Sequence, residues 1–288
     1  MNANLRRRRP AAGRVWLITG ASSGLGRAIA EAALASGDTV VAAVRAPASA
    51  GRLVAANPGR AAALQLDVAD TARIPAAVEE VIDQHGRIDV LVNSAGRALV
   101  GAVEETSDRE LRDLMEVHFF GPAALTRAAL PHMRRQRSGA IVQISSMGGR
   151  MSFPGVGAYS ASKFALEGLS EALAAEVAPF GIKVLIVEPG AFRTGLHRTG
   201  TRQESVPIPA YDDTVGPVRA QQADFDGKQP GDPAKAAAAI LTALEANTRP
   251  LHLPLGNDAA DAIATSLDTT RTELAAWEQI TRSTDYSQ

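Results

Sequence analysis

Short runs of aliphatic residues recur along the 288-residue chain, separated by longer segments whose apolar residues have helical spacing. The runs are apolar on consecutive residues, which is typical of β-strands that are buried on both faces. The expected strands cover residues 15–18, 39–44, 63–66, 88–92, 140–144, 183–187 and 251–255. The expected helices cover residues 25–35, 74–82, 111–133, 164–177 and 234–244. This alternation predicts an α/β protein with a doubly wound parallel sheet of about seven strands, flanked by helices on both faces.

The regular pattern stops at two places. Residues 1–13 contain four consecutive arginines before an apolar stretch that is too short for a membrane span, so we expect a flexible N-terminal tail rather than a targeting segment. Residues 191–231 mix prolines and glycines with large apolar side chains, which favours a substrate lid; a mobile loop is the alternative. Residues 14–288 are therefore expected to form one domain, with this lid as an insertion.

Composition excludes several classes of function. The chain is 45% hydrophobic and 21% charged, which is typical of a folded domain rather than a disordered one. A net charge of -1 argues against nucleic acid as a partner, and the absence of a long apolar run argues against a membrane. The lack of cysteine excludes disulfides and thiolate metal sites and fits a cytoplasmic protein. The histidines have no metal-ligand spacing, so no metal is expected; they are His85, His118, His132, His197 and His252.

A glycine-rich turn joins the first expected strand to the first expected helix. It reads Thr19-Gly20-Ala21-Ser22-Ser23-Gly24-Leu25-Gly26. Glycines let the backbone turn sharply and approach a pyrophosphate, which is stabilised by free N–H groups at a helix N-terminus. Dinucleotides bind at this place in doubly wound sheets, so the turn predicts a dinucleotide site; a plain tight turn is the alternative. The expected contacts come from Gly20, Ser22, Ser23, Gly24, Leu25 and Gly26.

Further motifs follow in chain order. Asn93-Ser94-Ala95-Gly96 comes after the fourth expected strand, and Pro189-Gly190 with Thr194 comes after the sixth. With the glycine turn, they resemble the short-chain dehydrogenase/reductase (SDR) family over about residues 13–255, and in particular its 17-beta-hydroxysteroid dehydrogenase branch. The resemblance implies a Rossmann-type fold, a nicotinamide cofactor and assembly as a homodimer or homotetramer. It also implies cofactor contacts from Asp67, Val68, Asn93, Ala95, Gly96, Tyr159, Lys163, Pro189, Gly190 and Thr194.

The end of the second expected strand bears on which nicotinamide cofactor binds. In dinucleotide folds a carboxylate at this place binds the ribose 2′-hydroxyl of NAD, whereas a cation accommodates the 2′-phosphate of NADP. Val44 stands where the family has its acidic residue, and Arg45 follows it. A guanidinium forms paired hydrogen bonds with phosphate, so NADP(H) is favoured over NAD(H). Ser23 departs from the family's basic residue in the glycine turn, and an ordinary solvated arginine is the alternative reading of Arg45.

Tyr159 and Lys163 are four residues apart, which places both side chains on one face of a helix. Tyrosine titrates near 10 and a nearby ammonium favours its phenolate, so the pair predicts general acid–base chemistry. The resemblance implies that Tyr159 gives its proton to a carbonyl oxygen while hydride reaches the carbon. It also implies that Ser146 polarises that oxygen, with Ser145 as the second candidate. A serine cluster at a helix start beside a surface ion is the alternative.

His118 replaces the asparagine that the family carries in its active site. The resemblance gives that asparagine a role in bending a helix and in holding a water of the lysine's proton relay. One hypothesis makes His118 a catalytic member of the relay; its charged form would then oppose Lys163, and activity would decline below about pH 6. The other hypothesis makes it a core histidine whose ring is bonded to backbone.

The expected substrate pocket is apolar, although each candidate wall residue has core or lid packing as its alternative. The candidates are Met147, Met151, Phe153, Val156, Phe192, Leu196 and Tyr211. They predict a hydrophobic carbonyl compound or secondary alcohol, and the resemblance permits an extended, steroid-like one. The predicted function is NADP(H)-dependent hydride transfer by a carbonyl reductase or alcohol dehydrogenase. The alternatives are a non-enzymatic NADP(H)-binding sensor or structural relative, and an epimerase or dehydratase.

Overall fold

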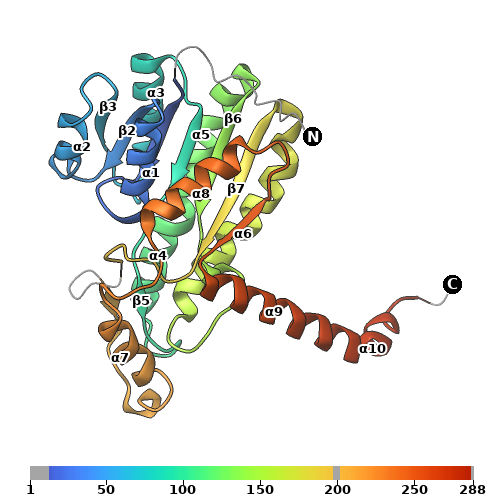
Figure 1. The fold of residues 1–288 in the computed structure, drawn as a ribbon. Helices are drawn as coiled ribbons and strands as arrows, with labels where there is room; N and C mark the ends of the chain where they lie inside the picture. Colours follow the sequence, from blue (N-terminus) through green and yellow to red (C-terminus); the bar gives the residue numbers. More distant parts are fainter. Residues whose placement is uncertain (1–12, 197–201, 287–288) are drawn as a thin grey trace, which may run out of the picture.

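The chain folds around one parallel sheet, and the computed structural model describes residues 13–196 and 202–286. The sheet has seven strands in the order β3-β2-β1-β4-β6-β7-β9 (Figure 1). Their bounds are β1 Val15–Thr19, β2 Thr39–Val44, β3 Ala61–Gln65, β4 Val90–Asn93, β6 Gly139–Ile144, β7 Ile182–Pro189 and β9 His252–Leu255. Every neighbouring pair is parallel, which confirms the predicted doubly wound, Rossmann-type sheet.

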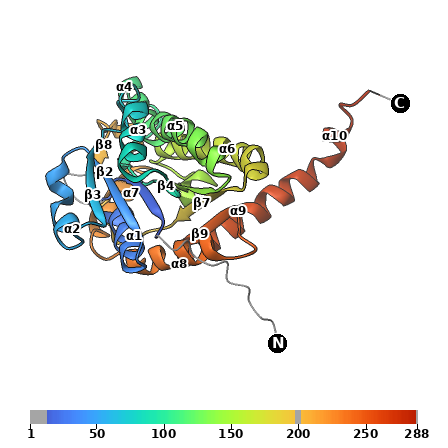
Figure 2. The same ribbon diagram turned by 90° about the horizontal axis from the view of Figure 1, so that it is seen from above.

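Helices cover both faces of the sheet (Figure 2). On one side lie α1 (Gly24–Ala35) and α8 (Pro233–Glu245), and on the other lie α3 (Ile74–His85), α5 (Gly121–Gln136) and α6 (Gly157–Val177). Successive residues of β1 point to opposite faces: Trp16 packs into the first core and Leu17 into the second. Both are fully buried, which explains why the strand is apolar on consecutive residues.

The strand order creates a crevice at the carboxyl ends of β1 and β4. From β1 the chain moves outward to β2 and β3, and then crosses back to place β4 on the other side of β1. The turns that follow β1 and β4 therefore diverge and leave a space between them, which is the usual ligand site of such sheets. The glycine turn and the loop after Asn93 border this space.

One expected helix is two helices in the structure. Residues 111–133 were expected to be continuous, but α4 (Asp108–Met115) and α5 are separated by a π-helical turn, η2 (Glu116–Phe120). Ser107 begins α4 with a capping box, since its hydroxyl accepts from Glu110 N while the Glu110 carboxylate accepts from Ser107 N. The π-turn contains His118 and turns its side chain into the core.

The proposed lid is partly ordered in the region that the structure describes. It contains β8 (Gln203–Glu204), which pairs with β5 (Leu99–Val100), and the helix α7 (Gly216–Asp224). The buried Glu105 carboxylate ties these parts together, because it accepts hydrogen bonds from Ile208 N at 2.8 Å and Arg219 Nη2 at 2.6 Å. Residues 202–225 are thus held against the loop after β5, and the role of this segment as a lid stays a prediction. The predictions for residues 1–12 and for His197 lie outside the described residues.

The chain ends in elements that the hydrophobic pattern did not predict. After β9, α9 (Asn257–Ala276) extends away from the body of the molecule and leads into α10 (Glu278–Arg282) (Figures 1 and 2). Ala259 and Ile263 are its buried residues, so only the start of α9 packs on the domain. A short helix after β2, α2 (Gly51–Ala55), was also missed. Within the described residues, none of the helices has the length and apolarity needed to cross a membrane.

Candidate active site

A cavity of about 870 Å³ opens at the carboxyl ends of the strands. It brings together nearly all of the residues predicted to bind a dinucleotide. Those that line it are Gly20, Ser22, Ser23, Gly24, Leu25, Gly26, Arg45, Asp67, Val68, Ala95, Gly96, Tyr159, Lys163, Pro189, Gly190 and Thr194. Ser146, the residue predicted to polarise the carbonyl, also lines it. Asn93 and His118 do not.

The glycine turn has the shape that a pyrophosphate requires. Gly20 has a positive φ of 67°, and a Cβ on Gly26 would lie 2.7 Å from the Gly20 carbonyl oxygen. Ser23 is the N-cap residue of α1, and within the described chain its side chain makes no capping hydrogen bond. The N–H groups of the first turn of α1 are therefore not capped by the Ser23 side chain and are available to an anion. This cradle fits the diphosphate of a dinucleotide cofactor.

Asn93 does not contact the cavity, which corrects its predicted role in cofactor binding. It is buried, and its Nδ2 donates to Gln143 Oε1 at 2.9 Å, so it joins β4 to β6. The loop that follows is held instead by Thr19, whose hydroxyl accepts from Ser94 N and Ala95 N at 2.9 and 3.1 Å. The Asn93–Gly96 motif therefore does mark a loop that borders the cavity, but its asparagine lies inside the sheet and holds β4 against β6.

The far end of the cavity has the features of an adenosine site. Val44 and the exposed Arg45 border it after β2, and Asp67 and Val68 border it after β3. The Asp67 carboxylate accepts from Ala69 N at 3.0 Å, which fixes the turn. Apart from Asp67, the groups at this end are apolar or cationic.

The reacting groups meet where β6 ends against α6. The Ser146 side chain lies near enough to the Tyr159 phenol to affect its pKa, and the Ser146 hydroxyl accepts from Gly148 N at 3.0 Å. Lys163 Nζ donates to the Ile144 carbonyl at 2.9 Å and lies 5.8 Å from the centre of the Tyr159 ring. The hydroxyl of Ser145, the second candidate, lies beside Glu167 instead. Ser146 is therefore the serine that faces the tyrosine.

Burial controls the charges of this pair. Burial raises the pKa of Tyr159, and the hydrogen bond from Ser146 opposes that rise. Burial lowers the pKa of Lys163 to about 8, with the negative charge of Glu167 acting in the other direction. The described side chains alone therefore do not make the phenol more acidic, and the expectation that Lys163 does so together with the positive nicotinamide of an oxidised cofactor stays a prediction. Tyr159 is protonated at neutral pH, which is the state that a proton donor needs.

His118 supports the cofactor loop from behind. Its Nε2 accepts from Arg97 N at 3.1 Å, and Nδ1 lies 2.9 Å from the Ser162 hydroxyl, which itself donates to the Tyr159 carbonyl at 2.7 Å. Because a backbone N–H can only donate, Nε2 carries a lone pair and Nδ1 carries the proton. Burial and the charges of Lys163 and Arg97 hold the pKa of His118 well below its usual value.

The expectation of a charged His118 near pH 6 is therefore wrong, whereas a role of the neutral ring in the relay stays a prediction. The ring stacks edge-on against Tyr159 at 5.5 Å between centres but does not line the cavity. The second hypothesis, a core histidine bonded to backbone, describes what is observed. His118 is a positioning residue, since a Cβ on Gly96 would lie only 3.2 Å from its Nε2.

His118→Asn is expected to weaken binding of a dinucleotide cofactor by about 3- to 10-fold, because one hydrogen bond that holds the loop after β4 is lost. The shape of the pH–rate profile between about pH 6 and pH 7 should match that of the parent protein, since the pKa of His118 is held well below its usual value. Cofactor titration and steady-state rates measure the two effects. A limb of the profile that disappears in the variant would restore His118 to the proton relay.

The substrate end of the cavity is mostly apolar, as predicted. Met147, Phe153, Val156, Phe192 and Leu196 line it. Met151 and Tyr211 do not, which corrects their assignment; the Tyr211 hydroxyl donates to Glu104 Oε2 at 2.6 Å on the lid surface. Sequence reasoning missed the residues that β5 and the lid contribute, which are Leu99, Gln203, Gln221, Gln222 and Phe225.

Asp258, at the start of α9, was also missed. Its carboxylate accepts from Ala191 N at 2.7 Å, and its oxygens lie about where a side chain on Gly190 would begin. The projecting C-terminal helix thus fixes the loop that the resemblance places at the nicotinamide. The glycine at position 190 indicates in the sequence that another group lies close to the backbone there, but it does not indicate that this group is Asp258.

Comparison with known proteins identifies the family. Residues 14–205 match the family model described as short chain dehydrogenase, which covers well over half of the chain. The protein belongs to the short-chain dehydrogenase family, whose members are oxidoreductases that use nicotinamide cofactors.

Three similar proteins place it more closely. A solved short-chain dehydrogenase from Streptomyces avermitilis is 58% identical with a TM-score of 0.90, covering 95% of this chain and 100% of that one. Oxidoreductase BOA17 of Botryotinia fuckeliana is 37% identical over 93% of this chain and 97% of its own length. The 3-ketodihydrosphingosine reductase of Bacteroides thetaiotaomicron is 45% identical over 63% of this chain and 65% of its own. None of these three is named as a hydroxysteroid dehydrogenase.

Proposed function

We propose that the protein is an NADP(H)-dependent carbonyl reductase, working in reverse as an alcohol dehydrogenase. The observation that supports the proposal is that Ser146, Tyr159 and Lys163 line the same cavity as the glycine turn, whose shape fits a diphosphate. Bound NADPH would supply the hydride. The remaining steps are proton transfers and hydrogen bonds that this chain's own side chains perform.

Tyr159 is the proton donor in the reductive direction. Ser146 lies near the phenol and affects its pKa, so a carbonyl oxygen placed between the two hydroxyls would accept from both. As negative charge develops on that oxygen, the phenol proton moves to it. The ammonium of Lys163, 5.8 Å from the ring centre, then stabilises the phenolate that is left.

The preference for NADP(H) rests on Arg45 beside the apolar Val44. Arg45→Ala is expected to weaken NADPH binding by about 10- to 100-fold and to leave NADH binding unchanged, because charge-assisted hydrogen bonds to a phosphate are lost. Arg52→Ala, an exposed arginine on α2 that does not line the cavity, is the matched control. Fluorescence titration measures the four affinities. An equal loss for both cofactors would contradict the preference.

The substrate class follows from the cavity wall. Aliphatic and aromatic side chains from β5, the loop after β6 and the residue that follows α7 line the cavity, together with the neutral amides of Gln203, Gln221 and Gln222. The charged residues Arg97 and Asp258 line it as well. The apolar part of the wall supports a hydrophobic ketone, aldehyde or secondary alcohol. A related reductase named for a long-chain keto base, 3-ketodihydrosphingosine, is consistent with that class.

A panel of carbonyl compounds, assayed in parallel with NADPH and NADH, tests the proposal. Faster oxidation of NADPH with apolar ketones or aldehydes is expected. Cofactor binding without hydride transfer to any of them would favour a sensor or structural relative. Tightly retained cofactor with no net redox change would favour an epimerase or dehydratase. Assembly as a homodimer or homotetramer, which the family resemblance supports, is measured separately by light scattering.

A further inference from the structure

A positively charged residue stands in the cavity wall close to the reacting groups. Arg97 directly follows the Asn93–Gly96 motif and lines the cavity. Its backbone N donates to His118 Nε2 at 3.1 Å, and the centre of the His118 ring lies 5.5 Å from that of the Tyr159 ring. Arg97 is therefore at the end of the cavity where a carbonyl group would react, and no step of the proposed reaction uses it.

The main chain fixes Arg97 from two sides. Its own N–H is bonded to the buried His118, as described above. The carbonyl of the next residue, Ala98, accepts from Gln203 N at 3.0 Å, and Leu99 pairs with Gln203 where β5 meets β8. Leu99 and Gln203 line the cavity as well. Arg97 thus stands between the loop after β4 and the strand β8, on a backbone that both of them hold in place.

The guanidinium of Arg97 lacks a counter-charge in the part of the chain that the structure describes. Its Nε is buried there without a hydrogen-bond partner, and no ion pair joins its terminal nitrogens to a carboxylate. Other half-buried arginines do have such partners: Arg14 pairs with Asp38, Arg150 with Glu188, Arg202 with Glu204 and Arg219 with Glu105.

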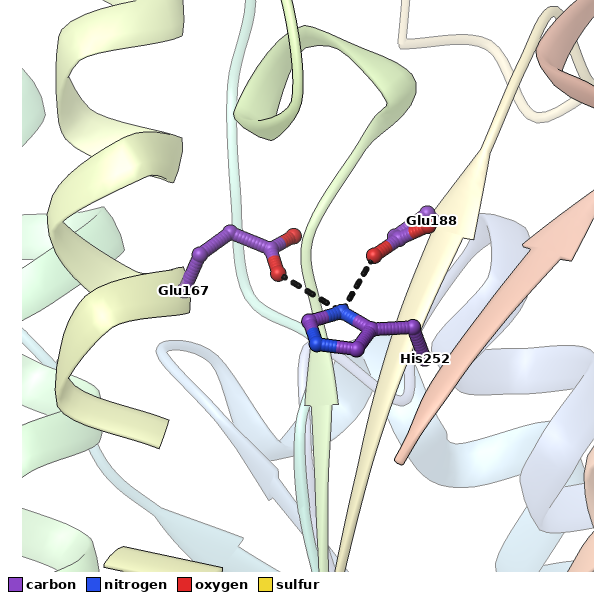
Figure 3. Close-up of side chains that lie close together, drawn as sticks. All are labelled: Glu167, Glu188 and His252. Carbon is purple, nitrogen blue, oxygen red and sulfur yellow. Dashed lines mark hydrogen bonds and ion pairs between the residues drawn. The ribbon is translucent and has the colours of Figure 1, made fainter. Parts of the chain in front are cut away.

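Arg150 shows how this fold neutralises a half-buried cation. Its Nη1 lies 3.4 Å from Oε1 of Glu188, which points toward Glu167 and His252 in a cluster that does not line the cavity (Figure 3). A charge that is withdrawn from water without a partner is costly. Because Arg97 faces a cavity and has no such carboxylate beside it, a ligand in the cavity is the natural source of its counter-charge.

The carboxylates that line the cavity are engaged elsewhere. Asp258 accepts from Ala191 N at 2.7 Å, in the loop after β7. Asp67 accepts from Ala69 N at 3.0 Å, at the end that has the features of an adenosine site. The lid contributes neutral amides, among them that of Gln203, and an amide N–H can donate to the same anion as a guanidinium.

The shape and charge of the guanidinium indicate which anion it takes. Two parallel N–H groups of an arginine match the two oxygens of a carboxylate. One guanidinium balances one negative charge, which suits a carboxylate better than a doubly charged phosphate. Leu99, Phe153 and Val156 supply apolar wall in the same cavity. A ligand that satisfies all of these groups has an apolar body and a single carboxylate.

We propose that Arg97 binds the carboxylate of an apolar oxo acid, so that the substrates are keto acids and the corresponding hydroxy acids. The inference rests on the proposed function, because Tyr159 and Ser146 act on the carbonyl of the same molecule. During reduction the carbonyl carbon receives the hydride of NADPH and the carbonyl oxygen receives the proton of Tyr159. The carboxylate and the guanidinium keep their charges throughout.

Benzoylpropionate and its methyl ester test this, because they share the ketone and the apolar body and differ in the charge at the other end. In the parent protein we expect kcat/KM for the acid to exceed that for the ester by about 10- to 100-fold, through charge-assisted hydrogen bonds. Arg97→Met should remove this preference, chiefly by raising KM for the acid, with the ester and NADPH affinity unaffected. Arg97→Lys should restore part of it.

Arg52→Met, an exposed arginine on α2 that does not line the cavity, is the matched control. Equal kcat/KM for acid and ester in the parent protein would overturn the proposal, and this comparison needs no variant. So would an equal loss for both compounds in Arg97→Met. A loss matched by weaker NADPH binding would likewise overturn it, since the guanidinium would then serve the cofactor.

Calorimetry separates this inference from the proposed function. The protein loaded with NADP⁺ cannot reduce the ketone, so titration with benzoylpropionate and its ester measures binding alone. Tighter binding of the acid that is lost in Arg97→Met would show the carboxylate site even if no carbonyl is reduced. Equal binding of acid and ester would contradict the site, whatever the outcome of the rate measurements.

Discussion

Tyr159→Phe is expected to lower the rate of NADPH-dependent carbonyl reduction by about 10²- to 10⁴-fold while leaving cofactor affinity unchanged. The substitution removes one hydroxyl, which is the group that we propose as the proton donor and which lies near Ser146. The ring and its edge-on contact with His118 at 5.5 Å remain, so the site keeps its shape. Steady-state rates and NADPH titration together measure the effect.

Tyr211→Phe is the matched control for this experiment. The Tyr211 hydroxyl donates to Glu104 on the lid surface and does not line the cavity, so its removal should leave the rate nearly unchanged. Substantial turnover by Tyr159→Phe would contradict the assigned proton donor. A large effect of Tyr211→Phe would mean that the lid contributes to catalysis in a way that the cavity walls do not reveal.

Lys163→Met is expected to abolish reduction and, at pH 7, to make the folded protein more stable. Lys163 is 5% exposed, and burial lowers its pKa from 10.5 to about 8. At 1.36 kcal/mol per pH unit, holding it charged costs roughly 3 kcal/mol. The lost hydrogen bond to the Ile144 carbonyl offsets about 1 kcal/mol. A net gain of about 2 kcal/mol should raise Tm by roughly 4–8 °C.

The sign of the pH dependence is a sharper test. Between about pH 8 and pH 10.5 the unfolded chain still binds a proton at this lysine while the folded protein does not, so parent stability rises with pH. The advantage of Lys163→Met should therefore shrink across that window. Lys235→Met, an exposed lysine in the first turn of α8, is the control and should show no such trend. A variant that is less stable than the parent at pH 7 would contradict the role of burial.

The fold could be predicted because its signals are local. Strands such as β1 are buried on both faces, so their runs of apolar residues stand out, and the Gly20–Gly26 turn lies within eight residues of chain. The pairing of Tyr159 with Lys163 likewise depends only on helical spacing. The π-turn at Glu116–Phe120 was not predicted, because the apolar spacing of residues 111–133 is that of a continuous helix.

Errors in the site arose where burial decides the role of a polar residue. Asn93 and His118 stand in motifs, but spacing does not tell whether a side chain faces the cavity or the core. The pKa of Tyr159 depends on how much burial opposes a neighbouring charge, which has no signature in sequence. Contacts between distant segments, such as Asp258 with Ala191 or His252 with Glu188, required the fold itself.

The transfer of deuteride from NADPH labelled at the nicotinamide C4 tests the central claim most directly. The parent protein should place deuterium on the carbinol carbon of an apolar ketone, with solvent supplying the hydroxyl proton, and Tyr159→Phe should place almost none. Bound NADPH with no label transferred to any carbonyl compound would contradict the account.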